Sequence, residues 1–128
     1  MSANPDGLDA RGLAEVLVAA ATDKLAWNPI VIDVRAKTSI AEYFVICEGE
    51  TDRQVRAIAD AMVEAARQVH VRPLGVTGYE DAVWVLLDFD SVLAHVFLPG
   101  ERAYYDLDSL WSAAERSRRA PARPASTA

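Results

Sequence analysis

The chain has only one cysteine, and it has no segment that would fit a membrane or an export signal. Cys47 has no second cysteine to pair with, and its apolar neighbours predict a small core residue rather than a nucleophile. No apolar run approaches the roughly 20 residues that a membrane-spanning helix needs. The first residues show no basic segment followed by an apolar one, so no signal peptide is expected. These absences predict a cytoplasmic protein.

Positive charge is scarce over most of the chain. The sequence has 13 Lys and Arg residues against 19 Asp and Glu residues, for a net charge of −6. Four of the arginines and one acid lie in residues 115–128, which leaves 9 basic and 18 acidic residues, a net charge of −9, in residues 1–114. An acidic surface repels phosphate, which argues against broad nucleic-acid binding. It suits either solubility alone or a basic protein partner.

Hydrophobic residues make up 52% of the 128 residues, enough for one domain with a real core. Their spacing predicts a helix over residues 9–25 and a clearer one whose apolar stripe runs from Val55 to Ala66 and ends near residues 69–70. Thr51 and Gln54 have the spacing of a capping box, in which each side chain bonds an amide of the first turn. Polar residues at the start of this helix, such as Arg53 and Arg56, are expected on solvated surface.

Short β-branched runs predict five strands, over residues 30–34, 43–47, 74–77, 83–88 and 92–98. A short closing helix is expected around Leu107, Leu110 and Trp111. The long helix between the second and third strands implies a crossover, and the last strands form a meander. We therefore predict the α/β class: a single small domain with a mixed β-sheet of about five strands flanked by helices.

The two ends of the chain are expected to lie outside this domain. Residues 1–7 form a polar leader, residues 8–114 the domain, and residues 115–128 a tail rich in arginine, proline and alanine. The tail has no apolar period, so we expect it to be disordered.

Asp88 and Asp90 are the best candidates for catalysis. Alternate residues of a strand face the same side, so the two carboxylates could share a magnesium ion, as in nucleotidyltransferases. Such enzymes also need a Gly-Ser turn that holds the phosphates, and here the matching turn contains Glu50, which would repel a triphosphate. Asp and Ser also favour hairpin turns. Three interpretations of Asp88 and Asp90 therefore stay open: a turn, which is favoured, a partner-binding role and a metal site.

The histidines and tryptophans are interpreted one by one. His95 alternates with Leu93 and Phe97, which predicts a half-buried, hydrogen-bonded structural histidine, since no second histidine or cysteine is near enough in sequence to complete a zinc site. His70 is expected to be exposed at a helix C-terminus. Trp84 shares its strand face with Leu86 and Asp88, and both core packing and an interface role fit it. Trp111 is interpreted as a core residue, and Trp27 receives no role.

A set of short motifs, in order along the chain, resembles one known family. They are Ile32-Asp33-Val34, Thr38-Ser39-Ile40-Ala41-Glu42-Tyr43-Phe44-Val45-Ile46, Asp52-Arg53-Gln54-Val55, Trp84, Leu87-Asp88, His95-Val96-Phe97 and Tyr105-x-Leu107-x-x-Leu110-Trp111. From about residue 13 to residue 112 the chain is similar to the ribosome silencing factor, or Iojap-like, family of bacteria and organelles. It departs from that pattern in the more acidic turn at residues 48–52 and in the arginine-rich tail.

The resemblance implies a nucleotidyltransferase-like fold without catalytic residues, and a protein that is not an enzyme. The resemblance further implies a translational repressor that binds the large ribosomal subunit through its ribosomal protein fourteen and so blocks joining with the small subunit when nutrients are scarce. The implied partner-binding patch contains Trp84, Leu86, Asp88 and Asp90, with Tyr104, Tyr105 and Asp106 beside it. The family pattern supports Trp84 and Asp88 directly, whereas Asp90 and Tyr104 are included for their proximity in sequence. No cofactor or metal is implied. A weak contact between the tail and ribosomal RNA stays open.

Two other hypotheses fit the sequence. A magnesium-dependent nucleotidyltransferase would use Asp88 and Asp90, and thermal stabilisation by magnesium and nucleotide would distinguish it. A self-associating structural module would pair two copies through an exposed strand and tryptophan surface, and sedimentation across concentrations would reveal such a homodimer. The homodimer is compatible with translational repression.

Overall fold

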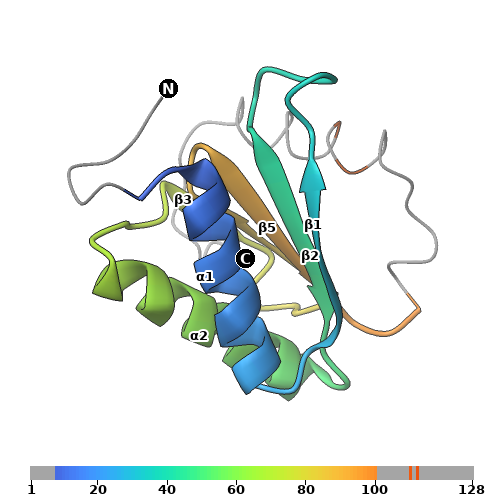
Figure 1. The fold of residues 1–128 in the computed structure, drawn as a ribbon. Helices are drawn as coiled ribbons and strands as arrows, with labels where there is room; N and C mark the ends of the chain where they lie inside the picture. The colour runs from blue at the N-terminus through green and yellow to red at the C-terminus, as the bar shows by residue number, and fades with distance from the viewer. Residues whose placement is uncertain (1–7, 101–109, 111, 113–128) are drawn as a thin grey trace.

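The computed structural model of this chain describes residues 8–100 together with Leu110 and Ser112. The described elements follow the order α1 (Ala10–Asp23), β1 (Trp27–Asp33), β2 (Tyr43–Glu48), α2 (Asp52–Gln68), β3 (Gly75–Thr77), β4 (Trp84–Asp88) and β5 (Val92–Phe97) (Figure 1). This order confirms the predicted α/β class. Neither described helix has the length and apolar character needed to cross a lipid bilayer.

The described strands form one five-stranded sheet in the order β1-β2-β5-β4-β3. β2 and β5 run parallel, whereas β1 with β2, β4 with β5, and β3 with β4 are antiparallel. A parallel pair needs a crossover connection, and α2 lies in the connection between β2 and β5. The sheet is therefore mixed, as the sequence predicted, and β5 lies at its centre.

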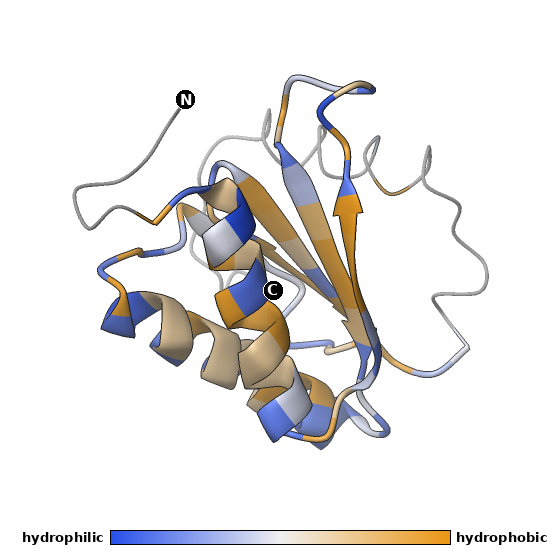
Figure 2. Ribbon diagram, in the orientation of Figure 1, coloured by the Kyte–Doolittle hydropathy of each residue, from blue (hydrophilic) through white to orange (hydrophobic). Residues whose placement is uncertain are grey.

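The two faces of the sheet have different coverings. α1 and α2 pack side by side on one face, where they bury a cluster that includes Leu17, Ile58 and Val96 (Figure 1). The opposite face carries a second cluster, which includes Phe44, Leu93 and Phe97. Because side chains alternate along a strand, β5 contributes to both clusters, and all six of its residues are buried. Figure 2 shows the matching hydrophobic character of the central strands.

α1 and α2 each begin with a side-chain cap. The Asp9 carboxylate accepts a 2.8 Å hydrogen bond from the Gly12 amide, and the Thr51 hydroxyl accepts a 3.1 Å hydrogen bond from the Gln54 amide. The predicted role of the Gln54 side chain in a capping box is wrong. The Gln54 side chain donates to the carbonyl of Lys24, the C-cap residue of α1. A contact between helices has replaced a local one, so Gln54 links the start of α2 to the end of α1.

The first strand begins earlier than the sequence predicted. Trp27 already pairs with Glu48, although the sequence predicted a strand only from residue 30. β1 is an edge strand, so proline removes no hydrogen bond from a neighbouring strand on its open side. The pairing register shifts between Trp27 and Ile30, and Asn28 has a φ of 51° there. A β-bulge therefore absorbs the two residues that the sequence pattern excluded.

Several predictions concern residues beyond the described ones. The leader 1–7, the tail 115–128 and Trp111 lie outside the described residues. Of the predicted closing helix, Leu110 is helical and only 4% exposed, and it packs in the second cluster. Cys47 is buried, as predicted, and His70 is exposed just after the end of α2.

Candidate partner-binding face

Three of the predicted partner-binding residues lie on one strand face. Trp84, Leu86 and Asp88 alternate along β4 with the buried Val85 and Leu87, which pack under the helices. Trp84 and Leu86 belong to the second cluster, on the sheet face away from α1 and α2. Trp84 and Asp88 are half-buried, whereas Leu86 is 6% exposed. A partner approaching this face would meet Trp84 and Asp88 before Leu86.

Strand pairing places residues of three other strands in one row with Trp84 across the sheet. Trp84 of β4 pairs with Phe97 of β5, Phe97 pairs with Glu48 of β2, and Glu48 pairs with Trp27 of β1. The rings of Trp84 and Phe97 lie 5.0 Å apart, and Trp27 is 44% exposed. Trp27 and Glu48 were not predicted to belong near Trp84, because only pairing between strands distant in the chain brings them to the same end of the sheet.

His95 lies directly behind Trp84. The indole Nε1–H of Trp84 donates a 3.1 Å hydrogen bond to Nδ1 of His95. The imidazole is fully buried, with the Phe44 ring 4.8 Å away. Burial disfavours the charged ring and lowers the pKa of His95 to about 3, so the side chain is neutral at pH 7. The prediction of a hydrogen-bonded structural histidine is confirmed.

The predicted half-burial of His95 is wrong. Alternation along one strand shows which side His95 faces, but it cannot show what covers that side. β5 is the central strand, and Phe44 of β2, Trp84 of β4 and Leu110 all pack in the cluster on the face that His95 shares. The covering residues come from three separate stretches of the chain, so no local pattern could have predicted the complete burial of the ring.

Asp88 and Asp90 form the hairpin turn between β4 and β5. The Asp88 carboxylate accepts a 2.8 Å hydrogen bond from the Asp90 amide, and the Phe89 amide donates to the Val92 carbonyl at 2.9 Å. Asp90 has a φ of 75°, a left-handed conformation that Asp tolerates better than most residues. The interpretation of these residues as a turn is confirmed. Within the described part of the chain, no group of three or more His, Cys, Asp or Glu side chains is placed to hold a metal ion.

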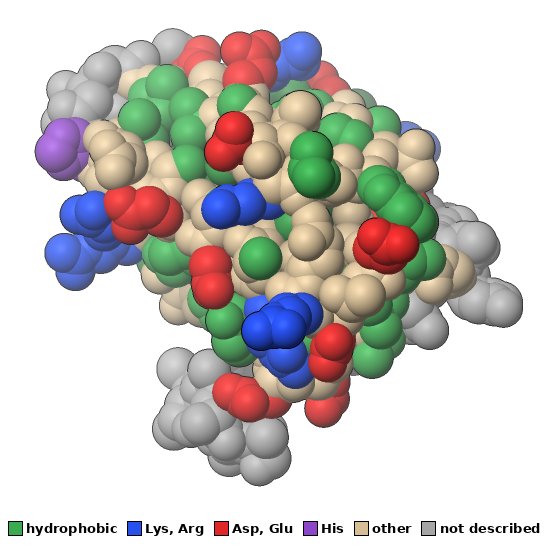
Figure 3. All heavy atoms as spheres, turned by 90° about the horizontal axis from the view of Figure 1, so that it is seen from below, with side chains coloured by type: hydrophobic (Ala, Val, Ile, Leu, Met, Phe, Trp, Pro, Cys, Tyr) green, Lys and Arg blue, Asp and Glu red, His purple; other side chains and the backbone are tan. Residues whose placement is uncertain are grey.

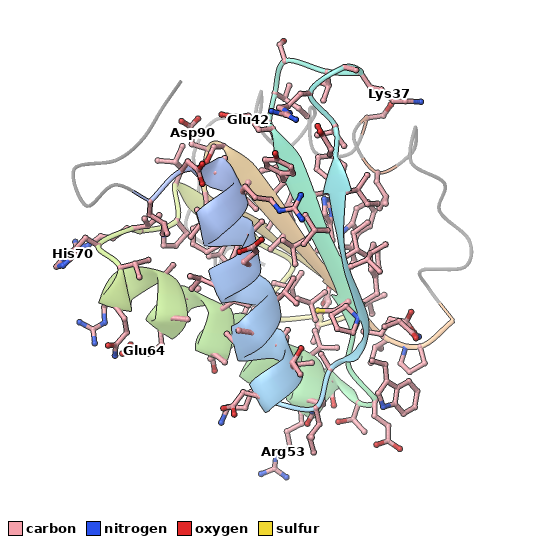
Figure 4. The ribbon with its side chains drawn as sticks, viewed as in Figure 1. Lys37, Glu42, Arg53, Glu64, His70 and Asp90 are labelled. Carbon is pink, nitrogen blue, oxygen red and sulfur yellow. The ribbon has the colours of Figure 1, made fainter. Side chains whose placement is uncertain are left out.

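Asp90 does not adjoin Trp84. The four residue steps from Trp84 to Asp88 span about 13 Å along the strand. Asp90 lies beyond Asp88, at the end of the sheet where Glu42 is seen, while Arg53 marks the opposite end (Figure 4). The Glu42 amide donates to the carbonyl of Ser91 at 2.8 Å, which fixes the β4–β5 turn beside the start of β2. The structure therefore brings together Trp84, Leu86 and Asp88 but leaves exposed Asp90 at the far end.

Arg56 supports the loop that leads into Trp84, although the sequence favoured solvated surface for it. Its guanidinium donates to the backbone carbonyls of Tyr79 at 3.2 Å and Glu80 at 2.7 Å. Within the same loop, the Ala82 amide donates to the Gly78 carbonyl at 2.9 Å. The helical pattern correctly placed Arg56 near the start of α2, but its acceptors are 23 and 24 residues away in the chain.

The turn before α2 caps the helix and joins it closely to the sheet. The Thr51 hydroxyl caps α2, and the Gly49 amide donates to the Phe97 carbonyl at 2.8 Å. A Cβ on residue 49 would lie 2.8 Å from the Val55 amide nitrogen, so glycine allows the close approach of strand and helix. Glu50 is exposed in this turn, where its charge would oppose a triphosphate.

The end of the domain that carries Arg53 has a mixed surface. Figure 3 shows acidic and basic side chains interspersed with hydrophobic ones on this side, rather than a field of one sign. Three other predicted residues, Tyr104, Tyr105 and Asp106, lie outside the described residues.

Comparison with known proteins identifies the family. Residues 8–128 match the RsfS family model, described as ribosomal silencing factor during starvation. The chain belongs to this family. The RsfS protein of Halalkalibacterium halodurans is 38% identical over 99 residues, which are 77% of this chain and 85% of that protein. The resemblance inferred from the sequence motifs is therefore confirmed.

One solved structure and one mouse protein are also similar to this chain. A crystal structure of a Chromobacterium violaceum protein superposes with a TM-score of 0.76 at 27% identity and covers 93% of this chain and 97% of that one. The mouse mitochondrial assembly of ribosomal large subunit protein 1 is 27% identical over 110 residues, which are 84% of this chain and 48% of the mouse protein. The structural match agrees with the α/β fold described above.

Proposed function

We propose that this silencing factor represses translation by docking on the large ribosomal subunit, through its ribosomal protein fourteen, and blocking its union with the small subunit when nutrients are scarce. Membership of the ribosomal silencing factor family is the observation that carries the proposal. The mouse relative is named for assembly of the large subunit, which supports the same partner here. The action requires binding alone, with no reaction at Asp88 or Asp90.

The face around Trp84 suits a basic protein partner. Trp84 is a half-buried aromatic residue, a type enriched among the residues that dominate binding energy at interfaces. Asp88 lies on the same strand face, and Glu48 lies one paired residue beyond Phe97. Residues 1–114 carry a net charge of −9, which would attract a basic ribosomal protein over long range. We therefore propose Trp84 and Asp88 as the main contacts, with Leu86 behind them and Asp90, Tyr104, Tyr105 and Asp106 beside them.

The size of the domain is sufficient for steric exclusion. A globular domain of about 100 residues has a radius of gyration of about 13 Å, which corresponds to a body roughly 30 Å across. Subunit joining requires close surface contact, so a body of that size on the joining face of the large subunit would prevent it. The repression would depend on occupancy, and therefore on the concentration of this protein relative to its affinity.

A subunit-joining assay tests this mechanism. Isolated large subunits are incubated with the protein, small subunits are added, and joined ribosomes are separated from free subunits on a density gradient. We expect the yield of joined ribosomes to fall with increasing protein, and Trp84→Ala to require a much higher concentration for the same effect. An unchanged yield at concentrations that saturate the large subunit would contradict the mechanism.

Removal of the arginine-rich tail is expected to spare the fold. Residues 116–128 have no apolar periodicity to bury, so their deletion should leave the melting temperature nearly unchanged. Binding to large subunits should weaken slightly and become less dependent on salt, because the four arginines of this segment would no longer contact phosphate. Thermal unfolding and binding at two salt concentrations check both points. A fall of many degrees on truncation would show instead that the tail is packed.

A further inference from the structure

His95 presents an unusual combination of burial and hydrogen bonding. Its side chain is 0% exposed, and Nδ1 accepts the hydrogen bond from the Trp84 indole at 3.1 Å. Its other ring nitrogen, Nε2, is buried and has no hydrogen-bond partner among the residues that the structure describes. Phe97 stacks nearly parallel to the imidazole, with an interplanar angle of 6° and a centroid separation of 6.2 Å. The polar ring therefore lies in an aromatic environment, and within the described part of the chain its one hydrogen-bond partner is Trp84.

The bond to Trp84 determines where the ring proton lies. Nδ1 accepts a hydrogen bond, so in the neutral ring the proton must lie on Nε2. Residues 8–100, with Leu110 and Ser112, offer this buried N–H donor no acceptor, which is unfavourable for folding. A leucine or phenylalanine could occupy the same apolar surroundings without that penalty. The feature that only the imidazole provides is the acceptor behind Trp84.

We propose that His95 is a positioning residue for docking: through Nδ1 it holds the Trp84 indole in the orientation that meets the partner. The inference rests on the proposed function, since it concerns how the same face binds. Trp84 is only half-buried, so its outer part faces solvent while its N–H group is directed into the sheet. Packing on Phe97 restrains one ring face, and the hydrogen bond fixes the rotation of the ring. An indole that is ordered before contact loses less conformational freedom on binding.

A double-mutant cycle separates positioning from general structural support. His95→Phe keeps an aromatic ring and removes the acceptor, and we expect it to raise the Kd for isolated large subunits about tenfold, the factor typical of one lost hydrogen bond. Trp84→Phe removes the donor. In the Trp84→Phe protein, the further change His95→Phe should alter the Kd by less than about twofold, because the bond is already absent. If His95→Phe raised the Kd by the same factor in the wild type and in the Trp84→Phe protein, the proposal would be overturned.

Two other variants protect the test against misfolding. His95→Leu also removes the acceptor with a smaller apolar side chain, and it should weaken binding like His95→Phe. His95→Asn places an amide oxygen near the position of Nδ1, and it should restore binding to within about threefold of the wild type. Thermal unfolding of each variant confirms that folded protein is compared. Strong binding by folded His95→Leu, or no recovery in folded His95→Asn, would count against positioning.

A spectroscopic measurement reports on the bond without the ribosome. The sequence has three tryptophans, and the indole N–H resonance of Trp84 is identified by its absence in Trp84→Phe. In the wild type this proton should exchange slowly with solvent, and His95→Phe should accelerate its exchange at least tenfold without changing the other two indole resonances. Equal exchange rates in the two proteins would show that Nδ1 does not hold the indole.

The outcomes distinguish this inference from the proposed function. If the wild type binds large subunits, Trp84→Ala does not, and His95→Phe binds normally, docking stands and positioning is overturned. If the wild type fails to bind, the proposed function falls, and with it any role of His95 in docking. Weaker binding and faster exchange of the Trp84 indole proton in His95→Phe, with recovery of binding in His95→Asn, would support both the proposed function and the positioning role of His95.

Discussion

Replacement of Trp84 by alanine is expected to weaken binding to isolated large subunits by about 2 kcal/mol or more, roughly thirtyfold in Kd. The change removes the half-buried indole from the β4 face and leaves a recess above Phe97. It also leaves Nδ1 of His95 without its donor. Titration of labelled protein with purified large subunits measures the effect directly. Wild-type affinity in a folded Trp84→Ala protein would remove Trp84 from the interface.

The same variant should also lose some stability, and a neighbouring residue supplies the control. Trp84 is neither an exposed anchor nor a core residue, so alanine should cost about 1–3 kcal/mol in free energy of unfolding, below the value for a fully buried tryptophan. Val85 is fully buried on the opposite side of the same strand, under the helices. Val85→Ala should lose comparable stability yet bind large subunits like the wild type. If Trp84→Ala and Val85→Ala weakened binding to large subunits equally, lost stability alone would explain the effect.

Replacement of Gly78 by alanine is expected to lower the free energy of unfolding by about 3 kcal/mol or more. Gly78 has a φ of 80°, and a left-handed conformation costs an L-residue roughly 1–2 kcal/mol. A Cβ at this position would also lie 2.2 Å from the carbonyl oxygen of Trp84, and such overpacking adds roughly 1–3 kcal/mol. Because the colliding oxygen belongs to Trp84 itself, the start of β4 must move. Denaturant unfolding measures the stability loss.

Gly75 provides the matched control for Gly78. It lies in β3, and a Cβ there would have no atom within 4 Å. Gly75→Ala should therefore remain within about 0.5 kcal/mol of the wild type and should bind large subunits normally. Gly78→Ala should instead weaken binding even under conditions in which most of the protein is folded. Coincident unfolding curves for the two variants would contradict the described geometry of the β3–β4 loop.

The sequence predicted the elements with strong local signals. The apolar stripe of α2 lies within Asp52–Gln68, and the residues Val55, Ile58 and Met62 are all buried. The β4–β5 hairpin follows from Asp and Ser at the turn, and alternation along β4 correctly placed Trp84, Leu86 and Asp88 on one face. These features depend on residues close together in the chain, which periodicity and turn chemistry can identify.

The features that sequence reasoning missed depend on contacts between distant segments. Gln54 bonds the end of α1, and Arg56 bonds the β3–β4 loop, although local rules favoured a cap and a solvated surface. His95 is buried because strands from both sides and Leu110 cover its face. Pro29 lies inside β1 because that strand is at the edge of the sheet. In each case, contacts between segments far apart in the chain determine the role of the residue. A single sequence does not show which segments make these contacts.

Co-sedimentation with purified ribosomal subunits tests the central claim most directly. The protein is mixed at micromolar concentration and low salt with large subunits or, in parallel, with small subunits, and each mixture is centrifuged through a cushion. We predict that the protein will pellet with the large subunit, in an amount that saturates near one copy per subunit, and will stay in the supernatant with the small subunit. Recovery of the protein only in the unbound fraction with large subunits would contradict the proposed function.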